Sequence, residues 1–482
     1  MTRRALLFVG VLTVLRFVLA ACLPLSFDES YFWLWSKHLA VSYYDHPPLI
    51  ALAIRLGTLV FGDTEFGVRF VPLLASVAAS WAVWRAAEVV SGDARTGALA
   101  ACLFNATLMV AAESMSATPD SLALASAAFA LLALVKIDRA GDGRWWLAAG
   151  LAIGQGLFAK YTAFFIAAGP CLWLVASPRG RAWLRTPWPY AGAVLALSFL
   201  ISTLLWNAAH DWISFKFQFG RVVTGTLTLR YLGELAAGQL ALASPFILAL
   251  GMIGLVRQSW KVPLSPAAAM VWPALIYFMI HALHDRVQGN WPSFIYPALA
   301  ILAAETMRRT EGSDMFVRHA RRFALPAACV ILTVAYFQGF TGFMPMGKAD
   351  PIARMTGIGV APVAADIGVL ASRDGAAAIV TTKYATASWL SFYARPRMLV
   401  IEMAESYRWI SAPAASAALL GKPLIYVTQN PQSELPLITA RFSSIHLLAV
   451  LPRLDRGVVI DRFYVYAVSG FQGPVAGRIP NG

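Results

Sequence analysis

The sequence has few charged residues for its length. Asp, Glu, Lys and Arg make up 13% of the 482 residues, whereas hydrophobic residues make up 59%. Soluble domains typically carry about 25% charged residues, so this composition excludes an ordinary soluble protein. Together with a mean hydropathy of +0.63, it is typical of a polytopic membrane protein.

Cysteine is also scarce. The four cysteines, Cys22, Cys102, Cys171 and Cys329, all lie within apolar runs and lack the spacing of metal ligands. We therefore interpret them as buried thiols rather than as a metal or disulfide framework. The sequence contains no internal repeat and no low-complexity tract.

Positive charge exceeds negative charge, with a formal net charge of +14. Such an excess is also found in nucleic-acid-binding proteins, but here the basic residues lie mostly in short loops between apolar runs. Membrane orientation requires this distribution, so we expect membrane lipids as a partner and no nucleic acid.

Apolar stretches of about 17–25 residues, the length that spans a bilayer, predict the architecture. About eleven spans are expected, near 5–25, 68–90, 97–114, 118–136, 147–159, 161–177, 188–206, 236–256, 264–283, 293–307 and 323–342. With a cytoplasmic amino terminus, the inner loops carry about twice as many Lys and Arg residues as the outer loops. We therefore expect a cytoplasmic amino terminus, and the odd number of spans places the carboxyl tail on the outer face of the membrane.

Two segments outside the spans have structure of their own. In the first outer loop, about residues 26–67, the segments 28–39 and 49–61 have the pattern of helices lying at the membrane interface. After residue 342, four β-rich runs (378–381, 398–401, 424–427 and 463–466) alternate with helix-like segments at 361–373, 384–393 and 411–421. The sequence thus predicts a transmembrane domain over 1–342 and a soluble α/β domain on the outer face over 343–482.

The first outer loop contains the most informative residues. Asp28, Glu29 and Asp45-His46 follow the first span closely, among many aromatic rings. Carboxylates beside hydrocarbon are costly, so their grouping indicates chemistry. The alternative is that the acids cap a helix, which explains one acid better than several.

Three further positions extend this candidate site. Asp120, after Thr118-Pro119, lies in an outer turn on the same predicted side as Asp28 and Asp45, although the pattern also suits helix capping. Three outward carboxylates can hold a metal ion, orient a nucleophile or bind sugar hydroxyls. Lys160, before Tyr161, either reaches the interface or grips a phosphate. Arg286 is a candidate phosphate clamp, and Trp291 either stacks on a sugar or anchors the chain at the interface.

Taken together, Asp28-Glu29, Tyr44-Asp45-His46-Pro47-Pro48, Thr118-Pro119-Asp120 and Lys160-Tyr161-Thr162 resemble motifs of a known family. The chain is similar to the GT-C membrane glycosyltransferases of the protein O-mannosyltransferase superfamily. Its bacterial branch includes the lipid A aminoarabinose transferase and rhizobial galacturonosyltransferases. The resemblance covers about residues 1–340 and is strongest over 26–50, and the tail offers no comparable motif.

The resemblance implies a function. Such enzymes transfer a sugar from a polyprenyl-phosphate carrier, outside the cytoplasmic membrane, with inversion at the anomeric carbon. By motif, Asp28 and Asp120 correspond to the family's two catalytic acids, and Asp45 with His46 to a pair near the donor. The aminoarabinose transferase has lysine where this chain has His46, so the resemblance does not identify the sugar.

We therefore expect an inverting transferase acting on lipid A or lipopolysaccharide core at the periplasmic face of the bacterial inner membrane, with Glu29, Tyr44, Asp45, His46, Lys160, Tyr161, Arg286 and Trp291 in donor or acceptor binding. No motif demands a cofactor, and a divalent cation held by Asp28, Asp45 and Asp120 is left open. The same chemistry on protein or another surface glycan is the near alternative. A lipid-linked sugar transporter or flippase is the alternative of another class, although such proteins often show inverted repeats.

Overall fold

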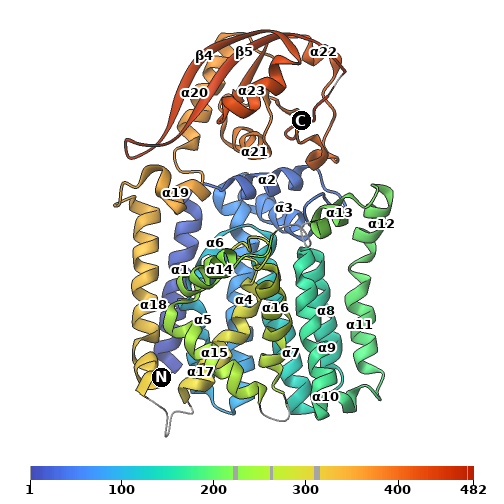
Figure 1. The fold of residues 1–482 in the computed structure, drawn as a ribbon, viewed down its shortest axis with the longest axis vertical. Coiled ribbons are helices and arrows are strands. Elements are labelled where there is room, and N and C mark those ends of the chain that lie inside the picture. Colours follow the sequence, from blue (N-terminus) through green and yellow to red (C-terminus); the bar gives the residue numbers. More distant parts are fainter. Residues whose placement is uncertain (1, 221–225, 261–263, 309–314, 475) are drawn as a thin grey trace. The chain divides into compact units, whose positions relative to one another are not determined.

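The computed structural model describes residues 2–220, 226–260, 264–308, 315–474 and 476–482 (Figure 1). The chain forms two compact units. The first unit contains Met1–Ala20, His46–Ala53 and Arg69–Ala335, and the second contains Ala21–Asp45, Ile54–Val68 and Tyr336–Gly482. Each unit is therefore assembled from segments that are distant in the sequence.

The first unit consists of helices. They are α1 (Thr2–Cys22), α4 (Glu65–Ser91), α5 (Ala94–Ala106), α6 (Leu108–Met115), α7 (Pro119–Ala140), α8 (Trp145–Ala159), α9 (Phe164–Ala176), α10 (Pro178–Trp183), α11 (Trp188–Ser198), α12 (Ile201–Ala209), α13 (Ile213–Gly220), α14 (Arg230–Ala243), α15 (Pro245–Ser259), α16 (Pro266–His281), α17 (Tyr296–Arg308) and α18 (Met315–Thr341). Two 3-10 turns, η1 (Tyr161–Ala163) and η2 (Ser293–Ile295), precede α9 and α17. The ends of α1, α4 and α18 belong to the second unit.

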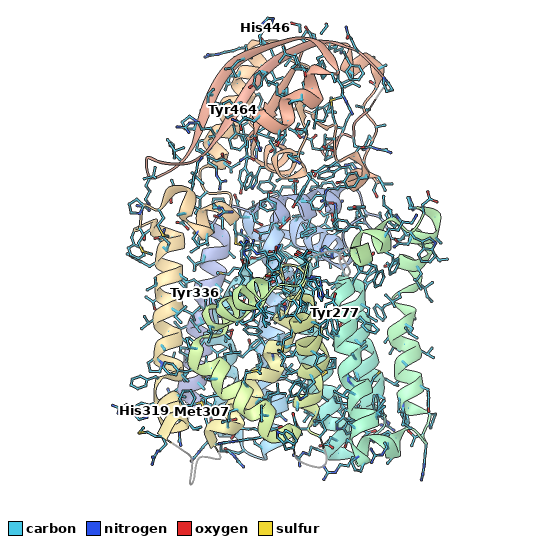
Figure 2. All side chains as sticks on the ribbon, viewed as in Figure 1. Tyr277, Met307, His319, Tyr336, His446 and Tyr464 are labelled. Carbon is cyan, nitrogen blue, oxygen red and sulfur yellow. The ribbon has the colours of Figure 1, made fainter. Side chains whose placement is uncertain are left out.

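The core of the first unit surrounds α7, most of which is buried. Tyr277 lies on α16 (Figure 2). The centroid of its ring lies 4.8 Å from that of Phe165. Helices α8 and α11 approach backbone to backbone, because a Cβ on Gly150 would lie 2.3 Å from the carbonyl oxygen of Gly192. Small residues at such contacts are typical of membrane helices.

Several helices are suited to crossing a membrane. Among the described residues, α1, α4, α7 and α18 are long and apolar enough by themselves, and three bent pairs raise the number to as many as seven. Each of the eleven predicted stretches contains helix, but α5–α6, α11–α12 and α14–α15 bend by 70°, 41° and 107°. The last bend differs most from a continuous span. It falls at Ser244, whose φ is +69°, followed by Pro245, which has no N–H to donate.

The cysteines differ from their predicted burial. Cys102 is buried in the protein, whereas Cys22 and Cys171 are exposed on helix surfaces and Cys329 is half-buried. The prediction that all four thiols are buried is therefore correct for Cys102 alone among the four. An apolar run predicts a helix but not which face of that helix meets protein.

The second unit combines helices with a mixed sheet. Its helices are α2 (Phe27–Lys37), α3 (Leu49–Phe61, whose first turn belongs to the first unit), α19 (Pro351–Met355), α20 (Val360–Arg373), α21 (Tyr384–Tyr393), α22 (Ala417–Leu420) and α23 (Pro431–Thr439), with turns η3 (Gly347–Ala349) and η4 (Ser406–Trp409). Its strands are β1 (Ile379–Thr381), β2 (Val400–Glu402), β3 (Leu424–Thr428), β4 (Phe442–Asp455) and β5 (Val458–Phe471).

The strands lie in the order β2-β1-β3-β5-β4. The first three are parallel, whereas β5 runs antiparallel to β3 and β4. All four predicted runs form strands, but β4 was not predicted. It lies at the edge of the sheet with half of its residues exposed, and its apolar run, residues 447–451, was not used in the prediction.

Helix α2 forms as predicted and packs against α21 within the second unit. The indole of Trp389 donates a hydrogen bond to the carbonyl oxygen of Leu25, and the hydroxyl of Tyr393 accepts one from the Leu25 N–H. The aromatic residues of α2, including Trp33 and Trp35, are buried in protein. This packing fixes the start of α2, where the candidate site begins.

Candidate active site

The two neighbouring acids in the first turn of α2, Asp28 and Glu29, have different roles. Ser26 caps the helix, because its hydroxyl accepts a hydrogen bond from the N–H of Glu29. The Glu29 carboxylate in turn accepts one from the N–H of Ser26 at 2.9 Å. This reciprocal capping box stabilises the helix start and gives Glu29 a structural role. The capping alternative therefore accounts for Glu29 but not for Asp28.

Asp28 takes no part in the helix cap. Its carboxylate accepts a hydrogen bond from the hydroxyl of Tyr384 at 3.2 Å, which is the only hydrogen bond to this side chain among the described residues. Burial by the surrounding side chains raises the pKa of Asp28 to about 7, and the nearby charge of Asp45 adds to the increase. A carboxyl group with such a pKa exchanges a proton readily near neutral pH.

Asp45 is held by a cation from the tail of the chain. Nη1 of Arg408 lies 2.6 Å from Oδ1 and 2.7 Å from Oδ2 of Asp45. The hydroxyl of Tyr31 donates to Oδ2 at 2.6 Å. Asp45 is only 8% exposed, so burying its charge is costly. The adjacent charge of Arg408 offsets this cost.

Aromatic rings surround Arg408. The guanidinium carbon lies 4.4 Å from the ring centroid of Tyr384, the residue that donates to Asp28, and 5.5 Å from that of Tyr44. Tyr384 is therefore placed by two contacts, one to the acid and one to the cation. We call Asp28, Tyr31, Asp45, Tyr384 and Arg408 the first-loop cluster, and all five belong to the second unit.

A second polar cluster is buried in the first unit. Nζ of Lys160 lies 2.5 Å from Oδ1 of Asp120, and the two side chains are 6% and 7% exposed. Asn290 donates from Nδ2 to Oδ2 of Asp120 at 3.1 Å, and the Ser293 hydroxyl lies 3.5 Å from Oδ1. We call these four residues the Asp120 cluster. The structure thus brings together Asp120 and Lys160, which the sequence analysis singled out separately.

Local structure explains the position of Asp120. Thr118 is the N-cap residue of α7 and Pro119 begins the helix, but the Thr118 side chain makes no capping hydrogen bond. Instead, its hydroxyl donates to the carboxylate of Glu113 on α6 at 3.1 Å. Asp120 lies in the first turn, where the helix dipole stabilises negative charge. Its oxygens nevertheless bind side chains from other elements.

The remaining predicted residues are less closely joined. Arg286 is exposed, and its Nε lies 3.2 Å from Glu234. The ring of Trp291 lies 5.8 Å from that of His281, and the ring of Tyr161 lies 5.4 Å from that of Phe215. His46 and Tyr44 are half-buried.

The structure does not support the metal site that the sequence analysis left open. Among the described residues, no three His, Cys, Asp or Glu side chains are arranged to hold one. Within the first-loop cluster, both oxygens of Asp45 already accept hydrogen bonds from Arg408. The residues around Asp45 therefore do not fit a metal ion.

Sequence reasoning missed five residues of the two clusters, namely Tyr31, Tyr384, Arg408, Asn290 and Ser293. Arg408 and Tyr384 lie in the tail, where no motif was found, and Asn290 received no role. The run Glu405-Ser406-Tyr407-Arg408-Trp409 does combine charge with aromatic rings beside a strand, and that composition is a usable signal. Its partner could not be read from the sequence, because Asp45 is 363 positions away.

Comparison with known proteins gives the family context. Residues 45–206 match the family model described as dolichyl-phosphate-mannose-protein mannosyltransferase. The chain is 26% identical over 310 residues to the lipid A galacturonosyltransferase RgtD of Rhizobium johnstonii, covering 61% of this chain and 64% of that protein. It is 28% identical over 333 residues to the undecaprenyl phosphate-alpha-4-amino-4-deoxy-L-arabinose arabinosyl transferase of Pseudomonas aeruginosa, covering 64% of this chain and 58% of that protein.

The fold is shared with a solved structure. ArnT from Cupriavidus metallidurans, crystallised with undecaprenyl phosphate, superposes with a TM-score of 0.63 at 17% identity, over 98% of this chain and 100% of that one. The sequence alignments cover less than two thirds of the curated relatives' lengths. The predicted resemblance to the GT-C membrane glycosyltransferases of the protein O-mannosyltransferase superfamily, including bacterial lipid A transferases, is confirmed by these matches.

Proposed function

We propose that this protein is an inverting glycosyltransferase that moves a sugar from a polyprenyl-phosphate carrier to lipid A or lipopolysaccharide core. The relatives support this substrate class, because RgtD and the arabinosyl transferases are named for lipid A or an undecaprenyl-phosphate sugar. The observation that carries the proposal is the burial of Asp28, which raises the pKa of its carboxyl group. Asp28 is the acid of the first-loop motif that the helix cap leaves available, and its pKa is raised to about 7.

Asp28 is assigned the proton-accepting role. If the acceptor is a sugar hydroxyl, its proton must leave as the bond to the anomeric carbon forms, and a carboxylate with a pKa near neutrality is suited to take it. Transfer then requires ionised Asp28, so the rate increases with pH through about 7. If the acceptor is a lipid A phosphate, it is already ionised, and Asp28 orients it instead.

The Asp120 cluster is assigned to the departing phosphate. An ammonium group stabilises the negative charge that the phosphate gains as the sugar leaves. Lys160 has three N–H donors, and Asp120 accepts from one of them, which fixes the position of the ammonium group. Asn290 supplies a further amide beside the same carboxylate. Asp120 is thus proposed to position Lys160 rather than to bind the sugar itself.

The predicted location belongs to the same proposal. It comprises eleven spans, an inner-membrane location and a periplasmic active site, where the polyprenyl-phosphate sugar and lipid A would meet. In this arrangement α2 and α3 lie along the interface. The apolar residues that α3 exposes, such as Leu56 at 59% and Val60 at 68%, support contact with lipid. The predicted domain of residues 343–482 would cover or recognise the acceptor.

Mass spectrometry of lipid A and core tests the proposal. Cells lacking the protein are complemented with wild type, Asp28→Asn, or Asp366→Asn, which removes an exposed acid on α20 as a control. We expect one glycosyl mass to be absent from the deletion and the Asp28→Asn strains and present in the other two. Unchanged lipopolysaccharide in all four strains would contradict the proposed acceptor and redirect the search to protein or another surface glycan.

A further inference from the structure

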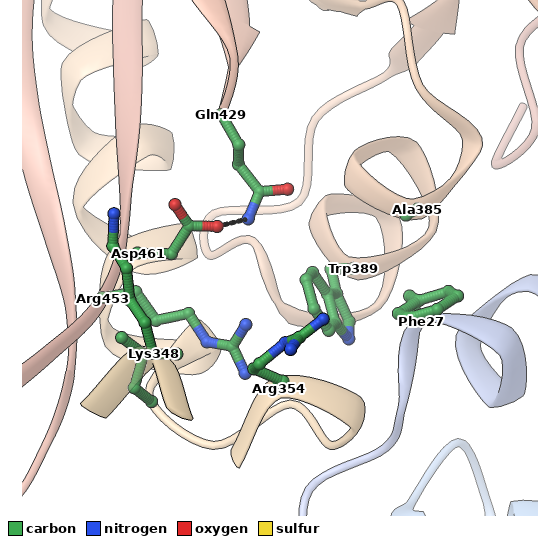
Figure 3. Close-up of a pocket in the computed structure, with 9 residues that line it drawn as sticks. Phe27, Lys348, Arg354, Ala385, Trp389, Gln429, Arg453 and Asp461 are labelled. Carbon is green, nitrogen blue, oxygen red and sulfur yellow. Dashed lines mark hydrogen bonds between the residues drawn. The ribbon is translucent and has the colours of Figure 1, made fainter. Parts of the chain in front are cut away.

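A cavity of about 430 Å³ lies within the second unit, and its lining includes none of the five residues of the first-loop cluster (Figure 3). Its wall includes three cations, Lys348, Arg354 and Arg453, and one acid, Asp461. Phe27 and Trp389 supply aromatic surface. This volume lies in the range of about 300–1,000 Å³ that is usual for small-molecule sites.

The charge of the cavity is not balanced by its own residues. Lys348 and Arg354 are exposed, and neither side chain makes a hydrogen bond or ion pair with a described residue. Asp461, which accepts a hydrogen bond from Nε2 of Gln429 at 2.7 Å, is one acid against the three cations of the lining. Unbalanced positive charge in a concave surface concentrates the field and attracts anions.

Arg453 is fixed in place before any ligand arrives. Its Nε donates to the carbonyl oxygen of Ile358 at 2.7 Å, and its Nη2 donates to those of Ala353 and Thr356, both at 2.6 Å. The guanidinium carbon lies 4.7 Å from the ring centroid of Trp389. Nη1 makes no hydrogen bond with a described residue, so a rigid donor remains at the cavity. A purely structural arginine explains the three carbonyl contacts, but not the two further cations beside it.

The cavity adjoins the first-loop cluster through one layer of rings. The ring of Phe27 lies 5.7 Å from that of Trp389, in the cavity, and 5.9 Å from that of Tyr384, edge to face in both cases. Tyr384 donates to Asp28, the residue that follows Phe27 in the chain. Because Phe27 lines the cavity and Asp28 follows it in the chain, an acceptor whose anionic group is held in the cavity would be bound beside the residue assigned as the base.

We propose that this cavity binds an anionic group, phosphate or carboxylate, carried on the acceptor saccharide, and that Lys348, Arg354 and Arg453 recognise it. The proposal rests on the transferase function above and names a specificity site for its acceptor. Aromatic rings suit the apolar face of a sugar, while cations suit its charged substituent. The polyprenyl phosphate donor carries the same anion, so the experiment must separate the two sources.

Direct binding is the first test. Full-length protein in lipid nanodiscs is titrated with glucosamine 1-phosphate, glucosamine, inorganic phosphate and undecaprenyl phosphate by calorimetry. The variant Lys348→Gln/Arg354→Gln removes the two exposed cations and leaves Arg453 in its structural contacts. The control Arg373→Gln/Lys422→Gln removes two other exposed cations of the same unit.

We expect the cavity variant to bind glucosamine 1-phosphate at least about tenfold more weakly than wild type, with the control variant unchanged. Undecaprenyl phosphate should bind wild type and cavity variant equally. The proposal fails if the cavity variant retains wild-type affinity for the phosphosugar. It also fails if glucosamine or inorganic phosphate binds as tightly as the phosphosugar, or if undecaprenyl phosphate binding weakens in the variant.

Steady-state transfer provides a second, independent readout. The cavity variant should show an acceptor KM raised about tenfold, with kcat and the donor KM close to wild type. A change in donor KM would place the anion site on the carrier instead. If wild type transfers no sugar, the transferase function fails, whereas the binding titration still tests the cavity.

Discussion

The ion pair between Asp45 and Arg408 offers a quantitative test of how the second unit is held together. Both side chains are largely buried, with 11% and 13% exposed, and the charged atoms approach to 2.6 Å. Replacing Arg408 by Gln leaves a buried carboxylate without its cation. Removing one partner of a buried pair costs about 3–5 kcal/mol, because the remaining charge is uncompensated.

This cost can be measured by thermal unfolding of the purified protein. For a unit of about 150–250 residues, 1 kcal/mol lowers Tm by about 2–4 °C, so Arg408→Gln should lower it by about 6–20 °C. Asp45→Asn should have an effect of similar size. The double variant has no unpaired charge, so it should be no less stable than the worse single variant, with a coupling energy of about 2 kcal/mol or more.

A matched pair in the same unit provides the control. Lys37 and Asp63 also approach to 2.5 Å, but their side chains are 26% and 25% exposed. Lys37→Gln should therefore cost about 1 kcal/mol or less. Strictly additive losses for Asp45→Asn and Arg408→Gln, or equal losses at the two pairs, would refute the reasoning that burial makes the first pair strong.

Three further predictions concern the buried acids. Burial raises the pKa of Asp28 to about 7, so the folded protein keeps a proton that the unfolded chain loses, and stability decreases as pH increases from about 4 through about 7. Asp28→Asn should therefore abolish transfer yet raise Tm, more at about pH 8 than at about pH 5; a lower Tm at both would contradict this. Burial likewise raises the pKa of Glu402 to about 7, so Glu402→Gln should raise Tm in the same pH direction but preserve transfer, which separates stability from catalysis. Lys160→Met should lower kcat by about 100-fold and lower Tm; adding Asp120→Asn should restore Tm but not kcat, and recovery of kcat would exclude a role for Lys160 at the phosphate.

Local patterns predicted most elements because their signals lie within a few residues. The helix over 49–61 follows Pro47-Pro48 and has exactly those bounds in the structure as α3. The core strands of the tail were readable from their apolar β-branched runs, such as Ile379–Thr381. Strand β4 also contains an apolar run, residues 447–451, but this run was not assigned from the sequence, and in the structure β4 lies at the partly exposed edge of the sheet.

Pairings across the chain were beyond sequence reasoning. The contact between Asp120 and Lys160 joins residues 40 positions apart, and that between Asp28 and Tyr384 joins residues 356 apart. Periodicity and capping rules report on the chain within one or two turns, so neither pairing leaves a local trace. The sequence could nominate Asp28, Asp120 and Lys160 as polar residues in costly places, but only the fold supplies their partners.

The different roles of Asp28 and Glu29 also show that local sequence patterns do not reveal long-range burial. Both acids precede an aromatic helix, and the Ser26-x-x-Glu29 spacing is a capping box that can be read directly from the sequence. Glu29 was nevertheless placed in donor or acceptor binding from the sequence, and the capping box was recognised only in the structure. The raised pKa of Asp28 depends instead on burial among residues of the tail, which no local pattern contains.

Transfer by the purified protein is the most direct test of the central claim. Wild type, Asp28→Asn and the control Asp366→Asn are placed in liposomes with a polyprenyl-phosphate sugar and lipid A, and the release of polyprenyl phosphate is measured together with the mass of lipid A. We predict that wild type and Asp366→Asn release carrier and add one glycosyl mass per carrier released, with inversion at the anomeric carbon, whereas Asp28→Asn does neither. Equal transfer by Asp28→Asn, or an intact donor with wild type across the candidate sugars, would contradict the account.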